Sequence, residues 1–405
     1  MSKILIYISA YTKTEDIPFV LAHNKTSSAA STIIYNTKLV KALRPFYDSI
    51  YFLSSPPIGS FPNHSSILRF RGFYKDKDFY AVAHSNLWGY RNVSIGRALI
   101  RSFKKRILPL LSTGDLIDVV AVEAHEPFLK AACFIKKCLS LRCTFTLVAP
   151  DLPTAMNPLK HSFVYNFFKA RDNNMILRHC AHADGFIFLS SGMKDYFQVG
   201  SRPFLISEGM YSGDFSTPSK PIPGRVVYTG TIAEKYSGTK TILDCARYFL
   251  TKSSFVTLVI AGSGDVSDFK KQIKELPNVL FLGKISPEDS AQLQKTASVL
   301  ISPRPDLPEL ANSFPSKLLE YIGTGRPVVS FRLRNFPAEY SSILYFPENS
   351  DSVSFALAIE KCLNLSQDEL ADNIQKSHDF LQEKTPSSVG KKIMCLLDEE
   401  RKLLK

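Results

Sequence analysis

A lysine and a glutamate stand three residues apart near the start of a short predicted helix, in the stretch SFPSKLLEYIGTGRPVV that begins at Ser313. Ser313 is the predicted N-cap of this helix. Lys317 then falls in the first turn, where the helix dipole disfavours a cation by roughly a few tenths of a kcal/mol. Two interpretations of Lys317 and Glu320 stay open: a surface ion pair worth under about 0.5 kcal/mol, or a bound anion at the helix N-terminus with a carboxylate beside it.

A second cation precedes this helix along the chain. Arg304 lies just past a predicted strand, at the start of the proline-broken loop ISPRPDLPELANSFPSK. Arg304, Lys317 and the backbone N–H groups around Phe314 and Ser316 could together clamp a diphosphate. Next to a diphosphate, the carboxylate of Glu320 would accept hydrogen bonds from a ribose diol. These residues therefore predict a site for a nucleoside diphosphate.

Two glycine-containing loops are expected at the same edge of the sheet. The stretch VVYTGTIAEKYSG places Gly230 right after a predicted strand, with Thr231 and Lys235 following, and glycine lets backbone approach a ligand closely. The stretch VIAGSGD supplies Gly262 and Gly264 after the next strand. The second stretch is not a GxGxxG fingerprint, so a tight turn at the strand end remains the alternative interpretation.

The elements that must position these residues alternate between buried strands and helices, which predicts α/β domains with parallel sheets. We expect two Rossmann-like doubly wound domains facing a cleft, with ligands at the carboxyl ends of the strands. The first domain covers residues 1–206, a linker rich in Gly, Pro and Ser covers 207–224, and the second domain covers 225–385. A final helix at 386–405 can cross back onto the first domain.

Composition limits the classes of function. The 405 residues, 45% of them hydrophobic, suffice for two cores. A net charge of +13 favours an anionic partner, yet no arginine-rich array, zinc finger or helix-turn-helix pattern indicates nucleic acid. Seven scattered cysteines fit reduced thiols in the cytosol. The opening MSKILIYISAY is expected to be a strand rather than a signal peptide, and no apolar run is long enough to span a membrane.

The second half of the chain resembles the nucleotide-sugar-binding domain of GT-B glycosyltransferases, specifically family 4 and related enzymes that build bacterial capsule, exopolysaccharide and O-antigen chains. The matching pieces are VVYTG, VIAGSGD, NVLFLGKISPED, LISPR and SFPSKLLEYIGTGRPVV, in matching order and spacing over about 110 residues. In the first half the likeness is looser and rests on SSAASTIIYNTKLVKAL and VAPDLP. The resemblance implies a GT-B fold and transfer of a sugar from a nucleoside diphosphate sugar, a UDP-sugar above all, to a lipid-linked or growing polysaccharide acceptor.

The resemblance also implies roles for single residues and shows departures from the family pattern. Glu320 corresponds to the second glutamate of the family's E-x7-E motif and would hold the ribose hydroxyls. The first glutamate falls at Asn312, an amide that can bond a sugar hydroxyl but carries no charge. Thr231 stands at the position of the family's arginine, and Ser237 stands near that of its lysine.

Lys235, Arg304 and Lys317 are our substitutes for binding the diphosphate, and they let the reaction proceed without a metal ion or other cofactor, as GT-B enzymes generally do. Members that retain the anomeric configuration are thought to pass the acceptor proton to the phosphate, whereas inversion requires a base from the first domain. The candidates in that domain are His125 and Asp151, each directly after a predicted strand. An aspartate before a proline can also be a simple turn former.

A basic segment indicates a further partner. Residues 69–106 hold ten basic side chains against two acidic ones, and the overlapping residues 95–108 form a basic amphipathic helix. Such a helix suits an anionic membrane surface, so we expect a cytoplasmic protein, peripheral at the inner face of the cell membrane. The alternative is an ordinary core-facing helix. Two rival functions also stay open: a sugar-nucleotide epimerase of the same fold, and a GT-B-like binding subunit without turnover.

Overall fold

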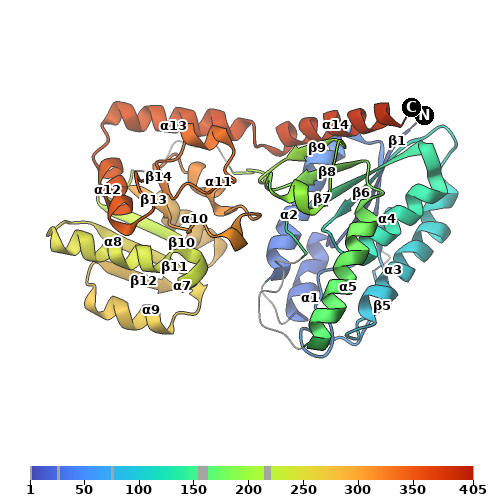
Figure 1. The fold of residues 1–405 in the computed structure, drawn as a ribbon, viewed down its shortest axis with the longest axis horizontal. Coiled ribbons are helices and arrows are strands. Elements are labelled where there is room, and N and C mark those ends of the chain that lie inside the picture. Colours follow the sequence, from blue (N-terminus) through green and yellow to red (C-terminus); the bar gives the residue numbers. More distant parts are fainter. Residues whose placement is uncertain (1, 25–27, 74–76, 154–162, 214–219, 405) are drawn as a thin grey trace. The chain divides into compact units, whose positions relative to one another are not determined.

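The computed structural model describes residues 2–24, 28–73, 77–153, 163–213 and 220–404, and these form two compact units (Figure 1). The first unit consists of Met1–Met210 together with Pro386–Lys405, and the second consists of Tyr211–Thr385. The linker expected at 207–224 is thus shared between the units, and its residues 214–219 lie outside the described part of the chain. Each unit contains a parallel sheet, as the α/β prediction requires.

Within the described residues the sheet of the first unit has seven parallel strands, in the order β4-β2-β1-β6-β7-β8-β9. Their bounds are β1 Lys3–Ser9, β2 Ser49–Ser54, β4 Phe79–Ala81, β6 Leu116–Val122, β7 Cys143–Ala149, β8 Gly185–Phe188 and β9 Phe204–Ile206. The strand order reverses between β1 and β6, because β2 lies on one side of β1 and β6 lies on the other. Open α/β sheets bind their ligands at the carboxyl ends of such strands.

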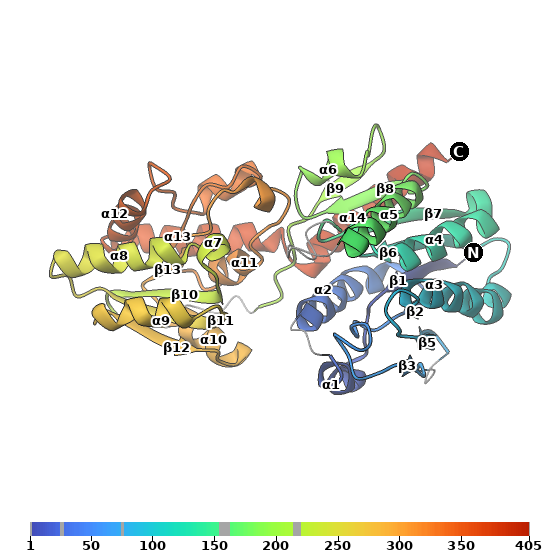
Figure 2. The same ribbon diagram turned by 60° about the horizontal axis from the view of Figure 1, so that its bottom comes forward.

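Alternation along β1 shows how the two faces of this sheet are covered. Ile4, Ile6 and Ile8 pack into one core with α3 (Arg91–Ser102) and α4 (Glu126–Leu139). Leu5 and Tyr7 point the other way, into a core shared with α2 (Ser28–Leu43) and α14 (Pro386–Leu403) (Figures 1 and 2). The unit also contains α1 Ile17–Ala22, α5 Phe163–Cys180, α6 Met193–Tyr196, and an antiparallel pair of strands, β3 Arg69–Phe70 and β5 His84–Ser85.

Within the described residues the second unit has five parallel strands in the order β12-β11-β10-β13-β14. The strands are β10 Arg225–Ile232, β11 Thr257–Gly264, β12 Val279–Gly283, β13 Val299–Ser302 and β14 Val328–Ser330. The helices are α7 Glu234–Ser237, α8 Thr239–Thr251, α9 Ser267–Gln272, α10 Pro287–Lys295, α11 Lys317–Ile322, α12 Ser352–Leu363 and α13 Gln367–Gln382. Here the order reverses between β10 and β13, which places the expected ligand position after those two strands.

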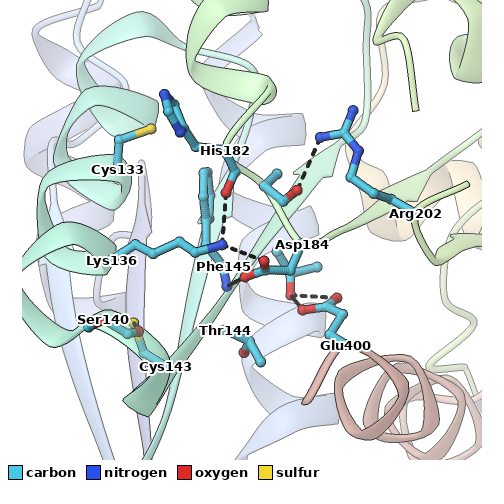
Figure 3. A network of polar contacts seen from close by, with 12 residues as sticks. Cys133, Lys136, Ser140, Cys143, Thr144, Phe145, His182, Asp184, Arg202 and Glu400 are labelled. Carbon is cyan, nitrogen blue, oxygen red and sulfur yellow. Dashed lines mark hydrogen bonds and ion pairs between the residues drawn. The ribbon is translucent and has the colours of Figure 1, made fainter. Parts of the chain in front are cut away.

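The last helix, α14, belongs to the first unit although it follows the second unit in sequence. Near its end Glu400 is fully buried, and both of its carboxylate oxygens lie 2.9 Å from the Thr146 hydroxyl of β7 (Figure 3). Burial raises the pKa of the Glu400 carboxyl well above its usual range. The next residue, Arg401, donates a hydrogen bond to the buried carboxylate of Asp118 in β6. Helix α14 is therefore fixed to the sheet by polar contacts as well as by its apolar face.

The amphipathic segment at 95–108 is a core-facing helix. Its apolar side chains Ile95, Leu99, Phe103 and Ile107 are fully buried in the first unit, so they are not available to a lipid surface. The expectation that this apolar face meets a membrane is therefore wrong. The basic side chains of the segment do point to solvent; they are Arg97, Arg101, Lys104, Lys105 and Arg106. No helix in the described ranges has both the length and the apolar character needed to cross a bilayer.

Candidate functional site

An arginine lies at the point where the strand order of the second sheet reverses. Arg304 is the second residue after β13, and its side chain is half-buried. Its guanidinium donates a hydrogen bond to the Ser313 hydroxyl, which donates in turn to the carbonyl of Leu310 at 3.2 Å. The loop after β13 thus holds a cation at the position where open α/β sheets bind ligands.

Tyr228 of β10 connects the chain after that strand to the neighbourhood of Arg304. The Tyr228 hydroxyl donates to the carbonyl oxygen of Thr231 at 2.8 Å and also bonds the side chain of Ser237. Burial raises the pKa of Tyr228, while the Ser237 bond and the positive charge of Arg304 oppose that rise. Thr231, Ser237 and Arg304 therefore gather around one phenol ring. Sequence reasoning selected Thr231 and Arg304 but missed Tyr228, which looked like an ordinary strand residue.

A glycine lets these two loops meet. Gly238 has φ +70°, and a Cβ there would lie 1.8 Å from the carbonyl oxygen of Pro303, the neighbour of Arg304. Helix α8 begins at the next residue, Thr239, whose buried hydroxyl has no hydrogen-bond partner among the described residues. Helix N-termini favour anions because their first N–H groups are unpaired. Neither Gly238 nor Thr239 was selected from the sequence.

Helix α11 begins at Lys317 and has six residues, with Ser316 at its N-cap. The prediction that Ser313 caps this helix is wrong, because the Ser313 hydroxyl bonds Arg304 instead. Lys317 is half-buried and Glu320 is exposed, and neither forms an ion pair or hydrogen bond with any described residue. The surface ion pair that the spacing suggested is therefore not formed, and both side chains are available to a ligand.

Just before α11, one side chain packs into the core, while several polar groups have no hydrogen-bond partner among the described residues. The Phe314 ring is buried, with its centroid 5.7 Å from that of Phe336 and 5.3 Å from that of Tyr340, so only its backbone can serve a ligand. In the described part of the chain, the N–H groups of Phe314 and Ser316 and the amide of Asn312 have no hydrogen-bond partner. These donors remain consistent with an anion or a sugar hydroxyl at this position.

The other predicted glycines serve the sheet. Strand β10 continues to Ile232, so Gly230 lies inside it and pairs with Gly262 of β11. A Cβ at Gly262 would lie 1.7 Å from the carbonyl oxygen of Gly230, and one at Gly264 would lie 2.1 Å from that of Ile232. The expectation that these glycines follow their strands is wrong, and so is the alternative of a tight turn. Lys235 is exposed on α7, with its ammonium 5.1 Å from the ring centroid of Tyr236.

In the first unit, His125 and Asp151 both follow central strands, as predicted. His125 is the N-cap of α4, and its Nε2 lies 3.2 Å from the side-chain oxygen of Asn92. Burial, then the charge of Arg91, then His84 lower the pKa of His125 to about 3, so the imidazole is neutral near pH 7. Asp151 is the second residue after β7, and its side chain is exposed.

One acidic residue at this edge was not selected from the sequence. Glu123 follows β6 directly, next to the position where the first sheet reverses its strand order. Burial raises its pKa to about 7; the charge of Arg91 and a bond to Thr32 oppose that rise, and the charge of Asp151 adds to it. In the sequence Glu123 looks like the last residue of an apolar strand. Its place at the carboxyl end of that strand was the signal that could have identified it as a site residue.

The described residues hold no group of three or more His, Cys, Asp or Glu side chains that could bind a metal ion. All seven cysteines are free thiols.

Comparisons with known proteins find a family match within the second unit. Residues 223–365 match the family described as Glycosyl transferases group 1. TuaH of Bacillus subtilis (strain 168), named as a putative teichuronic acid biosynthesis glycosyltransferase, is 29% identical over 125 residues, which is 30% of this chain and 31% of that protein. The chain therefore matches less than a third of this relative's length.

Solved structures resemble the chain over nearly its whole length. Anabaena HepE, solved in complex with UDP, has a TM-score of 0.59 at 13% identity and covers 98% of this chain and 100% of its own. A sucrose-phosphate synthase from Thermosynechococcus elongatus has a TM-score of 0.62 at 13% identity and covers 98% of this chain and 99% of its own. At such identities the likeness shows the fold.

Proposed function

On the premise that residues 223–365 are a Glycosyl transferases group 1 domain in a chain with the GT-B fold, we propose that this protein is a glycosyltransferase of polysaccharide biosynthesis. It transfers a sugar from a nucleoside diphosphate sugar to a lipid-linked or growing polysaccharide acceptor. The observation that carries this proposal is Arg304, a half-buried cation placed where the second sheet reverses its strand order.

The donor site follows from the side chains around Arg304. Arg304 and Lys317 neutralise the diphosphate, and the N–H groups of Phe314 and Ser316 donate to its oxygens. Glu320, exposed and unpaired in the described part of the chain, accepts hydrogen bonds from the ribose. Exposed Lys235 extends the positive charge of this edge. Thr231, Asn312 and Ser313 provide neutral polar contacts, and Gly230, Gly262 and Gly264 hold the sheet beneath them.

Three finer features of the donor reaction belong to the same proposal. UDP is the nucleotide, in line with the UDP bound to the similar structure of HepE. The leaving diphosphate is stabilised by protein cations, so no metal ion or other cofactor takes part. The family resemblance favours retention of the anomeric configuration, with the phosphate accepting the proton of the acceptor.

The acceptor binds to the first unit. His125 and Asp151 contact it: neutral His125 as a hydrogen-bonding group, and exposed Asp151 as a carboxylate for sugar hydroxyls. A lipid-linked acceptor would be met at the inner face of the cell membrane, where the exposed basic side chains of α3 would face anionic headgroups. That contact would be mainly electrostatic, because Ile95 and Leu99 on the apolar face of α3 are buried.

A non-catalytic GT-B-like subunit is the second candidate. The amide of Asn312 favours it, because this position lacks the charge that would stabilise a cationic sugar. A sugar-nucleotide epimerase of the same fold has less support, since such an enzyme is expected to bring several acidic residues and histidines together. The subunit hypothesis predicts UDP binding without turnover of any donor.

Calorimetric titration with UDP tests the donor site. Arg304→Ala and Lys317→Ala each remove a charge-assisted contact worth about 1.5–3 kcal/mol, so we expect UDP affinity to fall roughly 10- to 100-fold. Glu320→Gln should weaken UDP less, because it removes only a ribose contact. Lys361→Ala, an exposed lysine of α12, is the control and should bind UDP normally.

Release of UDP from UDP-sugars, with and without a lipid-linked glycan extract, then separates an enzyme from a binding subunit. The donor-site proposal is wrong if all three variants bind UDP as tightly as the parent while keeping its unfolding midpoint.

A further inference from the structure

The chain between β5 and α3 forms a turn whose apolar side chains are exposed to solvent (Figure 2). The N–H of Tyr90 donates to the carbonyl of Leu87 at 3.1 Å, and Gly89 has φ +80°, which are features of a β-turn with glycine at its third position. Leu87 is 45% exposed, Trp88 49% and Tyr90 44%. A Cβ at Gly89 would meet no atom within 4 Å outside its chain neighbours, so the turn projects into open space. We call residues 87–90 the apolar turn.

Buried polar groups fix the apolar turn from beneath. Asn86 is fully buried, and its side-chain nitrogen donates to the carbonyls of Gly59 at 2.6 Å and Ile67 at 3.0 Å. Its side-chain oxygen accepts from Nε of Arg91 at 2.9 Å, and a terminal nitrogen of Arg91 donates to the carbonyl of Ile58 at 3.1 Å. Both ends of the apolar turn are thus held by hydrogen bonds. The turn therefore has a fixed conformation in which its apolar side chains face outward.

The helix that follows continues this surface with positive charge. The Tyr90 hydroxyl, at the N-cap of α3, lies 3.4 Å from a terminal nitrogen of Arg97. Val93, Arg97 and Arg101 follow at intervals of four residues and are all exposed, so they lie along one side of α3. We call Arg97 and Arg101 the basic stripe. The sequence has no acidic residue from 79 to 114, so no nearby carboxylate along this part of the chain offsets that charge.

The combination of the apolar turn and the basic stripe indicates the kind of partner. Single exposed apolar residues are common on protein surfaces, whereas a contiguous group of them marks a contact. Tryptophan and tyrosine favour the headgroup level of a bilayer, and arginines beside an apolar group attract anionic lipids. A glycan would stack on the ring of Trp88 but give no role to Leu87 or to the basic stripe. Charge complementarity therefore favours an anionic lipid surface.

We propose that the apolar turn inserts between the headgroups of an anionic bilayer, with the basic stripe bound to lipid phosphates. This inference deepens the membrane contact of the proposed function and rests on that function for the presence of a lipid-linked acceptor. Leu87 and Trp88 supply the apolar contact that α3 itself lacks, because Ile95 and Leu99 are packed in the core. All these residues belong to the first unit.

Fluorescence of the full-length protein tests insertion directly, because Trp88 is the one tryptophan of the sequence. Vesicles of equal parts phosphatidylglycerol and phosphatidylcholine should shift the Trp88 emission to shorter wavelengths, and brominated acyl chains in them should quench it. Vesicles of phosphatidylcholine alone should do neither, because they lack the negative charge that attracts the basic stripe.

Sedimentation with the same anionic vesicles measures the contribution of single side chains. Leu87→Ser should weaken binding roughly 10-fold, because an inserted leucine leaves water. Leu141→Ser makes the same change at a leucine 74% exposed near the start of β7 and should bind like the parent. Arg97→Gln should weaken binding about fivefold, whereas Lys361→Gln, on α12 of the second unit, should not. Unfolding midpoints in urea should be equal for all four variants.

Three results would overturn insertion of the apolar turn. They are an unchanged Trp88 emission with anionic vesicles, vesicle binding by Leu87→Ser equal to that of the parent, and an emission shift caused by dextran oligosaccharides but not by vesicles, which would make the turn a glycan surface. The vesicles contain no sugar donor, so these failures leave the proposed transferase function in place. A protein that binds the vesicles but neither binds UDP nor transfers sugar keeps the inserted turn and removes that function.

Discussion

Tyr321 shows how a single hydroxyl supports the candidate donor site from beneath. It lies in α11, one residue after Glu320, and is buried. The ladder between β10 and β13 joins Val226 to Val299 and Val227 to Leu300. Beyond it the Tyr321 hydroxyl accepts from the N–H of Thr229 at 2.8 Å and donates to its carbonyl at 2.9 Å. The side chain therefore replaces a neighbouring strand for this residue of β10.

Tyr321→Phe should destabilise the protein, because it leaves a buried N–H and C=O of Thr229 without partners. Each such group costs about 1–3 kcal/mol, and we expect a total loss near 2–3 kcal/mol in the free energy of unfolding by urea. Tyr236→Phe, whose ring is exposed on α7, is the matched control and should stay within about 0.5 kcal/mol of the parent. An unchanged midpoint in Tyr321→Phe would show that water or another group satisfies Thr229.

The sequence predicted some of these side chains and not others, for physical reasons. Lys317 was recognised because a cation in a first helical turn conflicts with the dipole, and the structure leaves it unpaired among the described residues. Arg304 was recognised because it follows a strand. Glu123 was missed because the residue type does not reveal its positive φ. That backbone conformation accompanies the hydrogen bonds of Glu123 to Val148 and His125. Spacing along the chain carries no information on such long-range constraints.

Strands β10 and β11 depend on glycine where their backbones approach most closely. Gly262→Ala would place a Cβ 1.7 Å from the carbonyl oxygen of Gly230, and backbone cannot move aside as a flexible side chain does. We expect a loss of about 3 kcal/mol or more, at the upper end of overpacking changes. Gly114→Ala meets no atom within 4 Å and is the control. Urea unfolding measures both variants, and similar midpoints would show that the two strands can separate without cost.

Most helices and strands could be predicted from the sequence, because buried parallel strands appear as short apolar runs separated by helical patterns. The residues at which these elements end could not be predicted. Strand β10 extends two residues past Gly230, since pairing with β11 continues through Thr231 and Ile232. The apolar face of residues 95–108 was equally ambiguous, because a helix that packs on a sheet and a helix that lies on a membrane share one pattern. Burial of Leu99 and Phe103 decided between them.

The path of the whole chain makes the first unit depend on residues at the far end of the sequence. Asp118 is fully buried and accepts hydrogen bonds from the hydroxyls of Tyr47 at 2.7 Å and Thr144 at 2.6 Å, while Arg401 of α14 supplies the opposing charge. Removing one partner of a buried ion pair leaves an uncompensated charge and costs about 3–5 kcal/mol. The stability of the first unit therefore includes a contribution from the last turns of the chain.

Arg401→Met should destabilise the first unit by about 3 kcal/mol and leave the second unit unaffected, whereas Lys402→Met, with an exposed side chain, should change neither. Trp88 is the one tryptophan of the sequence and lies in the first unit, so its fluorescence reports that unit during urea unfolding. UDP at 100 times its Kd should stabilise the second unit by about 2.7 kcal/mol, and calorimetry would show this as a shift of a separate transition. If Arg401→Met and UDP move one common transition, the two units unfold together, and the contribution of α14 extends to the whole molecule.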